Sequence, residues 1–270
     1  MSTVKAAVLG SPIAHSKSPQ VHLAAYRALG LLDWTYERIE CTAEQLPTVV
    51  SGFGPEWVGV SVTMPGKFAA LRFADEHTQR AEMVGSANTL LHTERGWRAD
   101  NTDVDGVIGA LRSVDGYVDD NLVVLGSGGT ARAAVVAAGG LHARGVTVVA
   151  RDPARAEPLL TLAAATGLEG RWRAFADPGL ADEVAGAGAV VSTIPADAAA
   201  AHLAVLRRAP VLLDAIYDPW PTPLAAAVTE AGGTVIDGLQ MLLHQAFAQV
   251  EQFTGRPAPK EAMRAAVQRR

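Results

Sequence analysis

The chain alternates between short apolar runs and longer stretches in which apolar residues recur with helical spacing. Most of the runs are rich in valine, leucine and isoleucine and end at glycine, proline or polar residues, which is typical of buried strands. Because helix-like stretches separate the runs, the pattern predicts an α/β fold with parallel strands joined by helices. We expect strands at residues 6–9, 34–40, 58–62, 123–125, 146–150, 172–175, 189–192, 211–214 and 235–236, with a further short strand directly after 85–89.

Capping residues mark where the predicted helices begin and end. Ser18 and Pro19 are suited to the N-cap and first turn of a helix that Gly30 closes. Thr42 and Gln45 form a capping-box pattern at the start of another helix. The inward face of the first helix is predicted to comprise Val21, Ala24, Ala25 and Ala28.

A glycine-rich turn joins the strand at 123–125 to an alanine-rich helix. Gly126, Gly128 and Ala131 fit the G-x-G-x-x-G/A pattern, in which glycines let the backbone approach a pyrophosphate and the helix N-terminus supplies N–H groups. A glycine turn of this kind is also compatible with a simple strand-to-helix connection. The next strand ends at Arg151 and Asp152, where this fold usually contacts the adenosine ribose, and that spacing favours dinucleotide binding.

The glycine turn lies far from the start of the chain. Rossmann domains often begin near the first residue, yet about 120 residues come first here, which is nearly a domain's length. We therefore expect the leading segment to carry the substrate.

Composition sets the class of protein and disfavours several partners. With 270 residues, 49% of them hydrophobic and 19% charged, the chain is expected to form two modest domains. The net charge of −5 gives no basic field for nucleic acid or an anionic membrane. Cys41 is the only cysteine, so neither an intramolecular disulfide nor a thiolate zinc site can form. Because no signal-peptide pattern or membrane-spanning run occurs either, we expect a cytoplasmic protein without nucleic-acid or membrane partners.

Polar loops follow several predicted strands, and open α/β sheets bind ligands at such positions. Ser16 and Ser18 are either turn and capping residues or a pair of neutral donors for a substrate carboxylate. Lys67 is either a solvated charge or a partly desolvated lysine that exchanges a proton with a reacting oxygen. Asn88 and Asp103 each suit turn and cap roles, but together with Lys67 they are suited to grip a polyhydroxylated molecule.

Other catalytic constellations are weaker. Gln245 lies one turn after Met241 on the long C-terminal helix, where it is able to turn its amide toward a cleft. His15 and His22 lack a third partner, so the sequence predicts no metal site. A Ser-His-Asp hydrolase is disfavoured because the chain has no G-x-S-x-G elbow.

Seven motifs occur in order along the chain: residues 11–19 (SPIAHSKSP), 62–67 (VTMPGK), 85–89 (GSANT), 101–103 (NTD), the glycine loop, 214–219 (DAIYDP) and 238–245 (GLQMLLHQ). Together they resemble the shikimate dehydrogenase family. The resemblance implies an N-terminal α/β substrate domain that is completed by the C-terminal helices, with a Rossmann-type dinucleotide-binding domain inserted between them. The implied boundaries are 1–103 and 238–270 for the substrate domain and 104–237 for the Rossmann domain.

The resemblance also implies the reaction and its residues. The reaction is the reversible reduction of 3-dehydroshikimate to shikimate with NADPH, a step of aromatic amino-acid precursor and chorismate biosynthesis. Lys67 and Asp103 form the implied catalytic pair, and an ammonium beside the ketone oxygen is suited to donate its proton there. Ser16, Ser18 and Tyr217 are implied to contact the substrate carboxylate, with Thr63, Lys67, Asn88, Asp103 and Gln245 at the ring hydroxyls. The implied cofactor residues are Gly126, Ser127, Gly128, Gly129, Thr130, Ala131, Arg151, Asp152, Arg155 and Gly238.

One departure from the family pattern bears on the cofactor. NADP-specific members tend to show Asn-Arg-Thr where this chain has Ala150, Arg151 and Asp152. Arg151 and Arg155 suit a 2′-phosphate, whereas Asp152 repels it and suits the ribose hydroxyls of NAD. We expect NADP, with an NAD-dependent quinate or shikimate dehydrogenase as the alternative.

A second alternative is a non-catalytic nucleotide-sensing protein on the same fold, because fold alone does not establish activity. The presence of both Lys67 and Asp103 argues against it. The partner that we expect is a small-molecule substrate, bound by a monomer or a homodimer.

Overall fold

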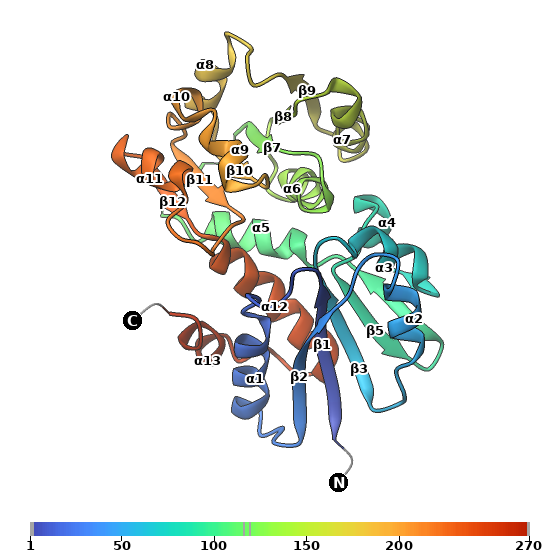
Figure 1. Cartoon of the computed structure of the whole chain (residues 1–270). Coiled ribbons are helices and arrows are strands. Elements are labelled where there is room, and N and C mark those ends of the chain that lie inside the picture. The colour runs from blue at the N-terminus through green and yellow to red at the C-terminus, as the bar shows by residue number, and fades with distance from the viewer. Residues whose placement is uncertain (1–2, 116, 119, 269–270) are drawn as a thin grey trace. The chain divides into compact units, whose positions relative to one another are not determined.

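The computed structural model describes residues 3–115, 117–118 and 120–268, which form two compact units, each with its own six-stranded sheet. The first unit comprises Met1–Thr102 and Leu242–Arg270, and the second comprises Asp103–Met241. The second unit is thus inserted into the first, and the chain returns within the helix α12 (Gly238–Thr254). The α/β class expected from the sequence is confirmed (Figure 1).

The first unit contains sheet A and five helices besides the greater part of α12. Its strands are β1 (Val4–Gly10), β2 (Trp34–Glu40), β3 (Trp57–Val62), β4 (Glu76–His77), β5 (Thr89–Thr93) and β6 (Gly96–Asp100). Its helices are α1 (Ser18–Ala28), α2 (Leu46–Ser51), α3 (Lys67–Phe73), α4 (Gln79–Val84) and α13 (Lys260–Ala265).

Sheet A is mixed, with the strand order β2-β1-β3-β5-β6-β4. β1 pairs in parallel with β2 and β3, whereas β5 is antiparallel to β3 and to β6. The expected parallel alternation is therefore wrong for this half of the sheet. A two-residue hairpin at 94–95, rather than a helix, joins β5 to β6, and so short a connection requires antiparallel strands.

Helices cover both faces of sheet A (Figure 1). On β1, Ala7 and Leu9 belong to the core that includes residues of α2, α3 and α4, whereas Ala6 and Val8 belong to the core that includes α1, α12 and α13. Successive side chains of a strand point to opposite faces, so a strand that is apolar at every position is buried between two layers. This is why the run at 6–9 is recognisable in the sequence.

The second unit contains sheet B, in which every pair of strands is parallel. Its strands are β7 (Leu122–Leu125), β8 (Gly145–Val149), β9 (Glu169–Arg173), β10 (Ala189–Ser192), β11 (Val211–Asp214) and β12 (Thr234–Ile236). Its helices are α5 (Asp103–Arg112), α6 (Gly129–Gly140), α7 (Pro153–Ala165), α8 (Leu180–Ala185), α9 (Ala196–Ala200), α10 (Leu203–Leu206) and α11 (Pro223–Glu230), followed by the first turn of α12.

The strand order β12-β11-β10-β7-β8-β9 reverses between β7 and β10. Such a reversal is the topological switch point of a doubly wound sheet, where ligands bind beyond the carboxyl ends of the strands. On one face, β7, β10 and β11 contribute Val123, Val190 and Leu212 to a core with α8, α9, α10 and α11. Within the described residues, no helix combines the length and the apolarity that crossing a bilayer requires.

The start of α1 differs from the prediction by one residue. The helix begins at Ser18 and its N-cap is Lys17, so that the expected N-cap role of Ser18 is wrong. The Ser16 hydroxyl accepts a hydrogen bond from the Ser18 N–H (3.3 Å) and provides the local turn chemistry instead. Ser18 is buried, and its side chain is a hydrogen-bond partner of Tyr36.

The buried face of α1 also differs from the prediction. Val21 and Ala25 are buried as expected, but His22 and Tyr26 take the places expected for Ala24 and Ala28. The buried face is thus turned relative to the predicted one, because the rings of His22 and Tyr26 pack against other aromatic rings.

Further along the chain, β9 begins three residues before the expected strand at 172–175, since its register with β8 runs from Glu169 to Arg173.

His22 makes the stability of the first unit depend on pH. It is fully buried and stacks on Tyr36, with 4.1 Å between ring centroids. Burial lowers the pKa of His22 to about 3, and the Gln249 side chain opposes this only in part. The unfolded chain therefore takes up a proton near pH 6.5 that the folded protein excludes, so stability falls as the pH drops from there toward 3.

We expect His22→Phe to remove up to about 1.4 kcal/mol per pH unit from this dependence. Urea unfolding of both proteins between pH 7 and pH 4 measures the slope. His244, whose pKa burial lowers to about 4, remains in both proteins and keeps part of the dependence. Equal slopes for the two proteins would contradict the assignment.

Candidate functional site

Four loops of the first unit meet at one edge of sheet A. β1 and β3 end together there, since Leu9 is paired with Val62. β5 begins and β6 ends at the same edge, because Thr89 is paired with both Ser61 and Asp100. Four loops therefore surround one region, at residues 11–17, 63–66, 85–88 and 101–102. They carry the predicted residues Ser16, Thr63 and Asn88. Ser18 and Lys67 begin the helices α1 and α3, which follow the first two loops.

The loops after β1 and β3 are tied to each other through the backbone. The Ser11 N–H donates to the Met64 carbonyl (3.0 Å), and the Thr63 N–H donates to the Leu9 carbonyl (2.8 Å). On the outer side, the exposed Arg38 guanidinium donates twice to the Ser16 carbonyl, at 2.7 and 2.9 Å. The segment with the predicted serine pair is thus fixed to its neighbour before any ligand binds.

Lys67 is the first residue of α3, and its side chain is half-buried. Its backbone carbonyl accepts a hydrogen bond from the Ala87 N–H (3.0 Å), which joins this loop to the segment that carries Asn88. The main chain of Lys67 therefore has a structural role that is independent of its ammonium group.

Asn88 lies at the centre of a buried polar cluster and is only 2% exposed. Its Oδ1 accepts from the Thr102 N–H (2.8 Å) and from the Thr89 hydroxyl (2.9 Å). Its Nδ2 donates to Gln245 Oε1 (2.9 Å) and to Thr102 Oγ1 (3.0 Å). Because a backbone N–H only donates, the Thr102 contact fixes which end of the Asn88 amide is the oxygen. The structure thus brings the predicted residues Asn88 and Gln245 into direct contact.

Asp100 holds the loop that carries Thr102. Its carboxylate accepts from Arg80, from the Thr78 hydroxyl (2.7 Å) and from the Asn101 N–H (2.8 Å). Burial disfavours the ionised form, but these hydrogen bonds and the Arg80 charge outweigh it and hold the pKa of Asp100 below its usual value. An ionised Asp100 therefore fixes the end of β6 at neutral pH.

Sequence reasoning missed the residues behind this cluster. Gln249 donates to the Asn88 carbonyl (3.1 Å) and accepts from the Ser61 hydroxyl (2.7 Å), and Gln252 donates to Asp100 (2.7 Å). Together with Gln245 these glutamines form a polar stripe at i, i+4 and i+7 of α12, which is otherwise largely apolar. This spacing is the sequence signal that could have found them, since glutamines on a buried helix face need partners.

In the second unit, the glycine loop lies at the carboxyl end of β7, beside the switch point of sheet B. Gly126 has a φ of +111°, a conformation that L side chains rarely adopt, and a Cβ there would lie 2.6 Å from Thr193 Oγ1. Gly128 is the N-cap of α6 and makes no side-chain cap, while a Cβ on it would meet open space. A helix N-terminus with open space in front of it suits a pyrophosphate, so the residues present fit a dinucleotide.

The segment after β8 carries the residues predicted to choose the cofactor. Arg151, Asp152 and Arg155 are exposed. Asp152 is the N-cap of α7, and its Oδ1 accepts from the Ala154 N–H (2.9 Å). The sequence predicts only a cofactor role for Asp152, and the structure adds this capping role.

Three further predicted residues belong to the second unit and are placed as follows. Asp103 begins α5 and is 5% exposed. Tyr217 follows β11 and is half-buried. Gly238 is the first residue of α12, and its N–H donates to the carbonyl of Ile216, the residue that precedes Tyr217 (3.2 Å). Asp214 orders this loop by accepting from the Thr222 hydroxyl (2.7 Å).

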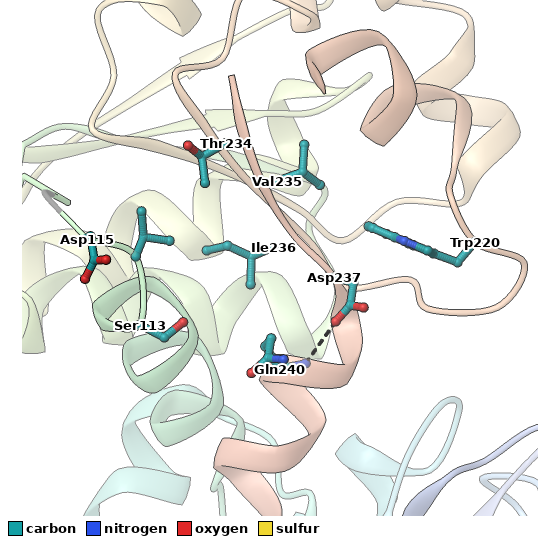
Figure 2. A pocket seen from close by; sticks show the side chains of 9 residues that line it. Ser113, Asp115, Trp220, Thr234, Val235, Ile236, Asp237 and Gln240 are labelled. Carbon is teal, nitrogen blue, oxygen red and sulfur yellow. Dashed lines mark hydrogen bonds between the residues drawn. The ribbon is translucent and has the colours of Figure 1, made fainter. Parts of the chain in front are cut away.

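A cavity of about 560 Å³ lies beside β12 in the second unit. Figure 2 shows Trp220, Asp237 and Gln240 around it, with the hydrogen bond from the Gln240 N–H to Asp237. None of the predicted site residues lines this cavity. Within 3–115, 117–118 and 120–268, no three His, Cys, Asp or Glu side chains are grouped so as to hold a metal ion.

Two family models match the chain. The model described as "Shikimate dehydrogenase substrate binding domain" matches residues 8–90, and the one described as "Shikimate 5'-dehydrogenase C-terminal domain" matches residues 238–268. Shikimate dehydrogenase (NADP(+)) of Microcystis aeruginosa is 34% identical over 271 residues, which cover 96% of this chain and 94% of that protein.

Solved structures are similar over the same length. Shikimate dehydrogenase of Mycobacterium tuberculosis is 68% identical with a TM-score of 0.92, over 97% of this chain and 98% of that one. Quinate dehydrogenase of Corynebacterium glutamicum, solved in complex with NAD, is 25% identical with a TM-score of 0.81, over 98% of this chain and 99% of that one.

The two loop glycines should respond differently to a methyl group. We expect Gly126→Ala to lower the thermal unfolding midpoint by several degrees, because it forces an L residue to a strained φ. Gly128→Ala should change the unfolding free energy by no more than about 0.5 kcal/mol, yet weaken NADPH binding roughly tenfold by filling the open space. Thermal unfolding and fluorescence titration with NADPH measure the two effects. Unchanged NADPH affinity in Gly128→Ala would exclude this loop as the pyrophosphate site.

Proposed function

Because the chain belongs to the shikimate dehydrogenase family, we propose that it catalyses the reversible NADPH-dependent reduction of 3-dehydroshikimate to shikimate. The observation that carries the proposal is the convergence of Ser16, Ser18, Thr63, Lys67, Asn88 and Gln245 on one polar edge of sheet A. The reaction is a step in aromatic amino-acid precursor biosynthesis.

The polar edge suits a small, polyhydroxylated acid. Ser16 offers a neutral hydroxyl donor to the carboxylate. The Ser18 hydroxyl donates to Tyr36 in this structure, so in this proposal it turns from Tyr36 to the carboxylate, and Tyr217 of the second unit adds a phenol. Thr63, Asn88 and Gln245 offer hydroxyl and amide groups to the ring hydroxyls, which in this proposal replace the contacts of Asn88 Nδ2 with Gln245 and Thr102. A site built to hydrogen-bond hydroxyl groups discriminates strongly against analogues that lack them, because its polar groups are then left unpaired.

Lys67 and Asp103 supply the proton chemistry in this proposal. NADPH, when bound, supplies the hydride that reduces the ketone carbon. The Lys67 ammonium donates a proton to the carbonyl oxygen as negative charge develops on it. Asp103 holds the same oxygen or the neighbouring hydroxyl in this proposal.

The glycine loop and the segment after β8 hold the cofactor in this proposal. Residues 126–131 present backbone N–H groups at the start of α6 to the pyrophosphate, and Gly238 lies at the start of α12. The exposed Arg151 and Arg155 side chains bind the 2′-phosphate of NADP. The NADP-dependent relative from Microcystis aeruginosa supports this choice.

The second candidate is an NAD-dependent quinate or shikimate dehydrogenase. Asp152 is the observation that favours it, since a carboxylate accepts from ribose hydroxyls and repels a 2′-phosphate. The similarity to a quinate dehydrogenase in complex with NAD points the same way. The capping bond weakens this argument, because it gives Asp152 a reason to be present that does not involve the cofactor.

We place the reaction in the cytoplasm, which suits a chain whose single cysteine, Cys41, is buried and free. The expected state is a monomer or a homodimer, and sedimentation of the purified protein determines which.

One spectrophotometric assay separates these functions. Shikimate or quinate is combined with NADP or NAD at neutral to alkaline pH, and reduced nicotinamide is followed. The proposal expects the highest kcat/KM with shikimate and NADP. Faster turnover of quinate with NAD would favour the second candidate, and no turnover in any combination would leave a non-catalytic protein.

Lys67→Ala tests the proton donor. We expect kcat to fall by a factor on the order of 10² or more while KM changes less. The fold should persist, since the contact with Ala87 uses the main chain. Lys5→Ala is the matched control, because Lys5 lies at the other end of β1 beside Glu56. This substitution should leave kcat unchanged. A near-normal kcat for Lys67→Ala would remove Lys67 from the chemistry.

Asp152→Thr tests cofactor choice without loss of the helix cap. Threonine keeps a capping oxygen for Ala154 but removes the negative charge. We expect the ratio of kcat/KM for NADP to that for NAD to rise about fivefold, which corresponds to roughly 1 kcal/mol of repulsion. Asp152→Ala should raise the ratio similarly but destabilise α7 by about 1 kcal/mol. An unchanged ratio in both variants would show that Asp152 serves only as a cap.

A further inference from the structure

A buried chain of hydrogen bonds lies behind the polar edge of sheet A. Tyr36, Ser61 and Gln249 are 4%, 4% and 0% exposed. The Tyr36 hydroxyl donates to Ser61 Oγ (2.6 Å), and the Ser61 hydroxyl donates to Gln249 Oε1 (2.7 Å). These bonds anchor the Gln249 carboxamide to β2 and β3, so α12 is fixed to the sheet at this point.

The other end of the same carboxamide holds the segment that carries Asn88. Gln249 Nε2 donates to the Asn88 carbonyl (3.1 Å) and to Thr89 Oγ1 (2.8 Å). The Thr89 hydroxyl in turn donates to Asn88 Oδ1 (2.9 Å). Gln249 therefore restrains the main chain of Asn88 directly and its side chain through one hydroxyl group.

The proton count fixes the direction of every bond in this chain. A carbonyl only accepts, so the Asn88 carbonyl requires the NH₂ group of Gln249 to face it and the Gln249 oxygen to face Ser61. The single Ser61 proton is then used on Gln249, and Ser61 must accept from Tyr36. The orientation of one buried amide thus determines the hydroxyl orientations along the chain.

We propose that Gln249 is a positioning residue of the substrate site, which acts through the Thr89 hydroxyl and the Asn88 carbonyl to fix the Asn88 amide for a ring hydroxyl. The inference rests on the proposed function, in which Asn88 binds that hydroxyl. Without the carboxamide, Ser61 and Thr89 each lose a buried partner, and such groups reorient to recover hydrogen bonds. A small displacement of a binding group is enough to weaken a precisely oriented site.

Gln249→Met is the first test, because methionine keeps the length of the side chain and removes its polar atoms. We expect the KM for shikimate to rise about tenfold, the loss of one well-placed hydrogen bond, with the KM for NADP nearly unchanged. Thr89→Val, which removes the linking hydroxyl at constant volume, should raise the KM for shikimate to a similar extent.

The double variant distinguishes positioning from general weakening. If both residues act on Asn88 through the same contact, the double variant should show an effect well short of the product of the single effects. Val250→Ala is the matched control, because Val250 is the buried apolar neighbour of Gln249 on α12. It should lower the unfolding midpoint by creating a cavity and leave the KM for shikimate unchanged.

Each outcome decides the proposal. Wild-type turnover of shikimate with an unaltered KM in both single variants overturns the positioning role and leaves the proposed function standing. Effects that multiply in the double variant, or an equal rise in Val250→Ala, show loss of stability and also overturn it. If Gln249→Met does not fold, Ser61→Ala replaces it under the same criteria. A wild type that does not turn over shikimate overturns the proposed function and this inference together.

Discussion

The burial of the Asn88 side chain is the constraint on which the first unit depends. A primary amide away from water must have partners for two donors and an oxygen, and leaving them unpaired costs several times the net gain of one hydrogen bond. Thr102 and Thr89 satisfy the oxygen, and Gln245 and Thr102 satisfy the nitrogen. These partners come from the adjoining first residue of β5, the loop after β6 and α12, so satisfying one side chain aligns its own segment with one 14 residues away and one 157 residues away.

The second unit depends on a different constraint, which is the close approach of the backbone after β7 to the loop after β10. In sheet B the loops after β7 and β10 crowd each other at the switch point, and Gly126 is needed because a Cβ would reach Thr193. At Gly128 the backbone is open instead, since among the described residues no atom beyond Gly128 and its chain neighbours lies within 4 Å of where a Cβ would be. The first unit thus provides a polar, preorganised edge, and the second an open helix N-terminus that suits a nucleotide phosphate.

Much of this could be predicted from the sequence, for identifiable reasons. A buried strand such as β7 is apolar at every position, and Lys67 follows β3 while Asn88 precedes β5, at one edge of sheet A. The face of α1 could not be predicted, because the packing of His22 against Tyr36 decides it. The short strand after 85–89 is present as β5, but its antiparallel pairing could not be predicted from the alternation of strands and helices. The chain through Ser61 joins residues 25 and 188 positions apart, and a sequence does not show which buried polar groups become partners.

The proposed function depends on shikimate binding at the polar edge of sheet A. The most direct measurement is a crystal structure of the wild-type protein soaked with shikimate, refined with attention to the region around Asn88. We expect the ring hydroxyls to lie within hydrogen-bond distance of Asn88 and Gln245, and the carboxylate at Ser16 and Ser18. Shikimate bound at another place would contradict the proposal. In that case Asn88 and Gln245 would keep their contacts with each other and with Thr102, and only solvent would lie beside them.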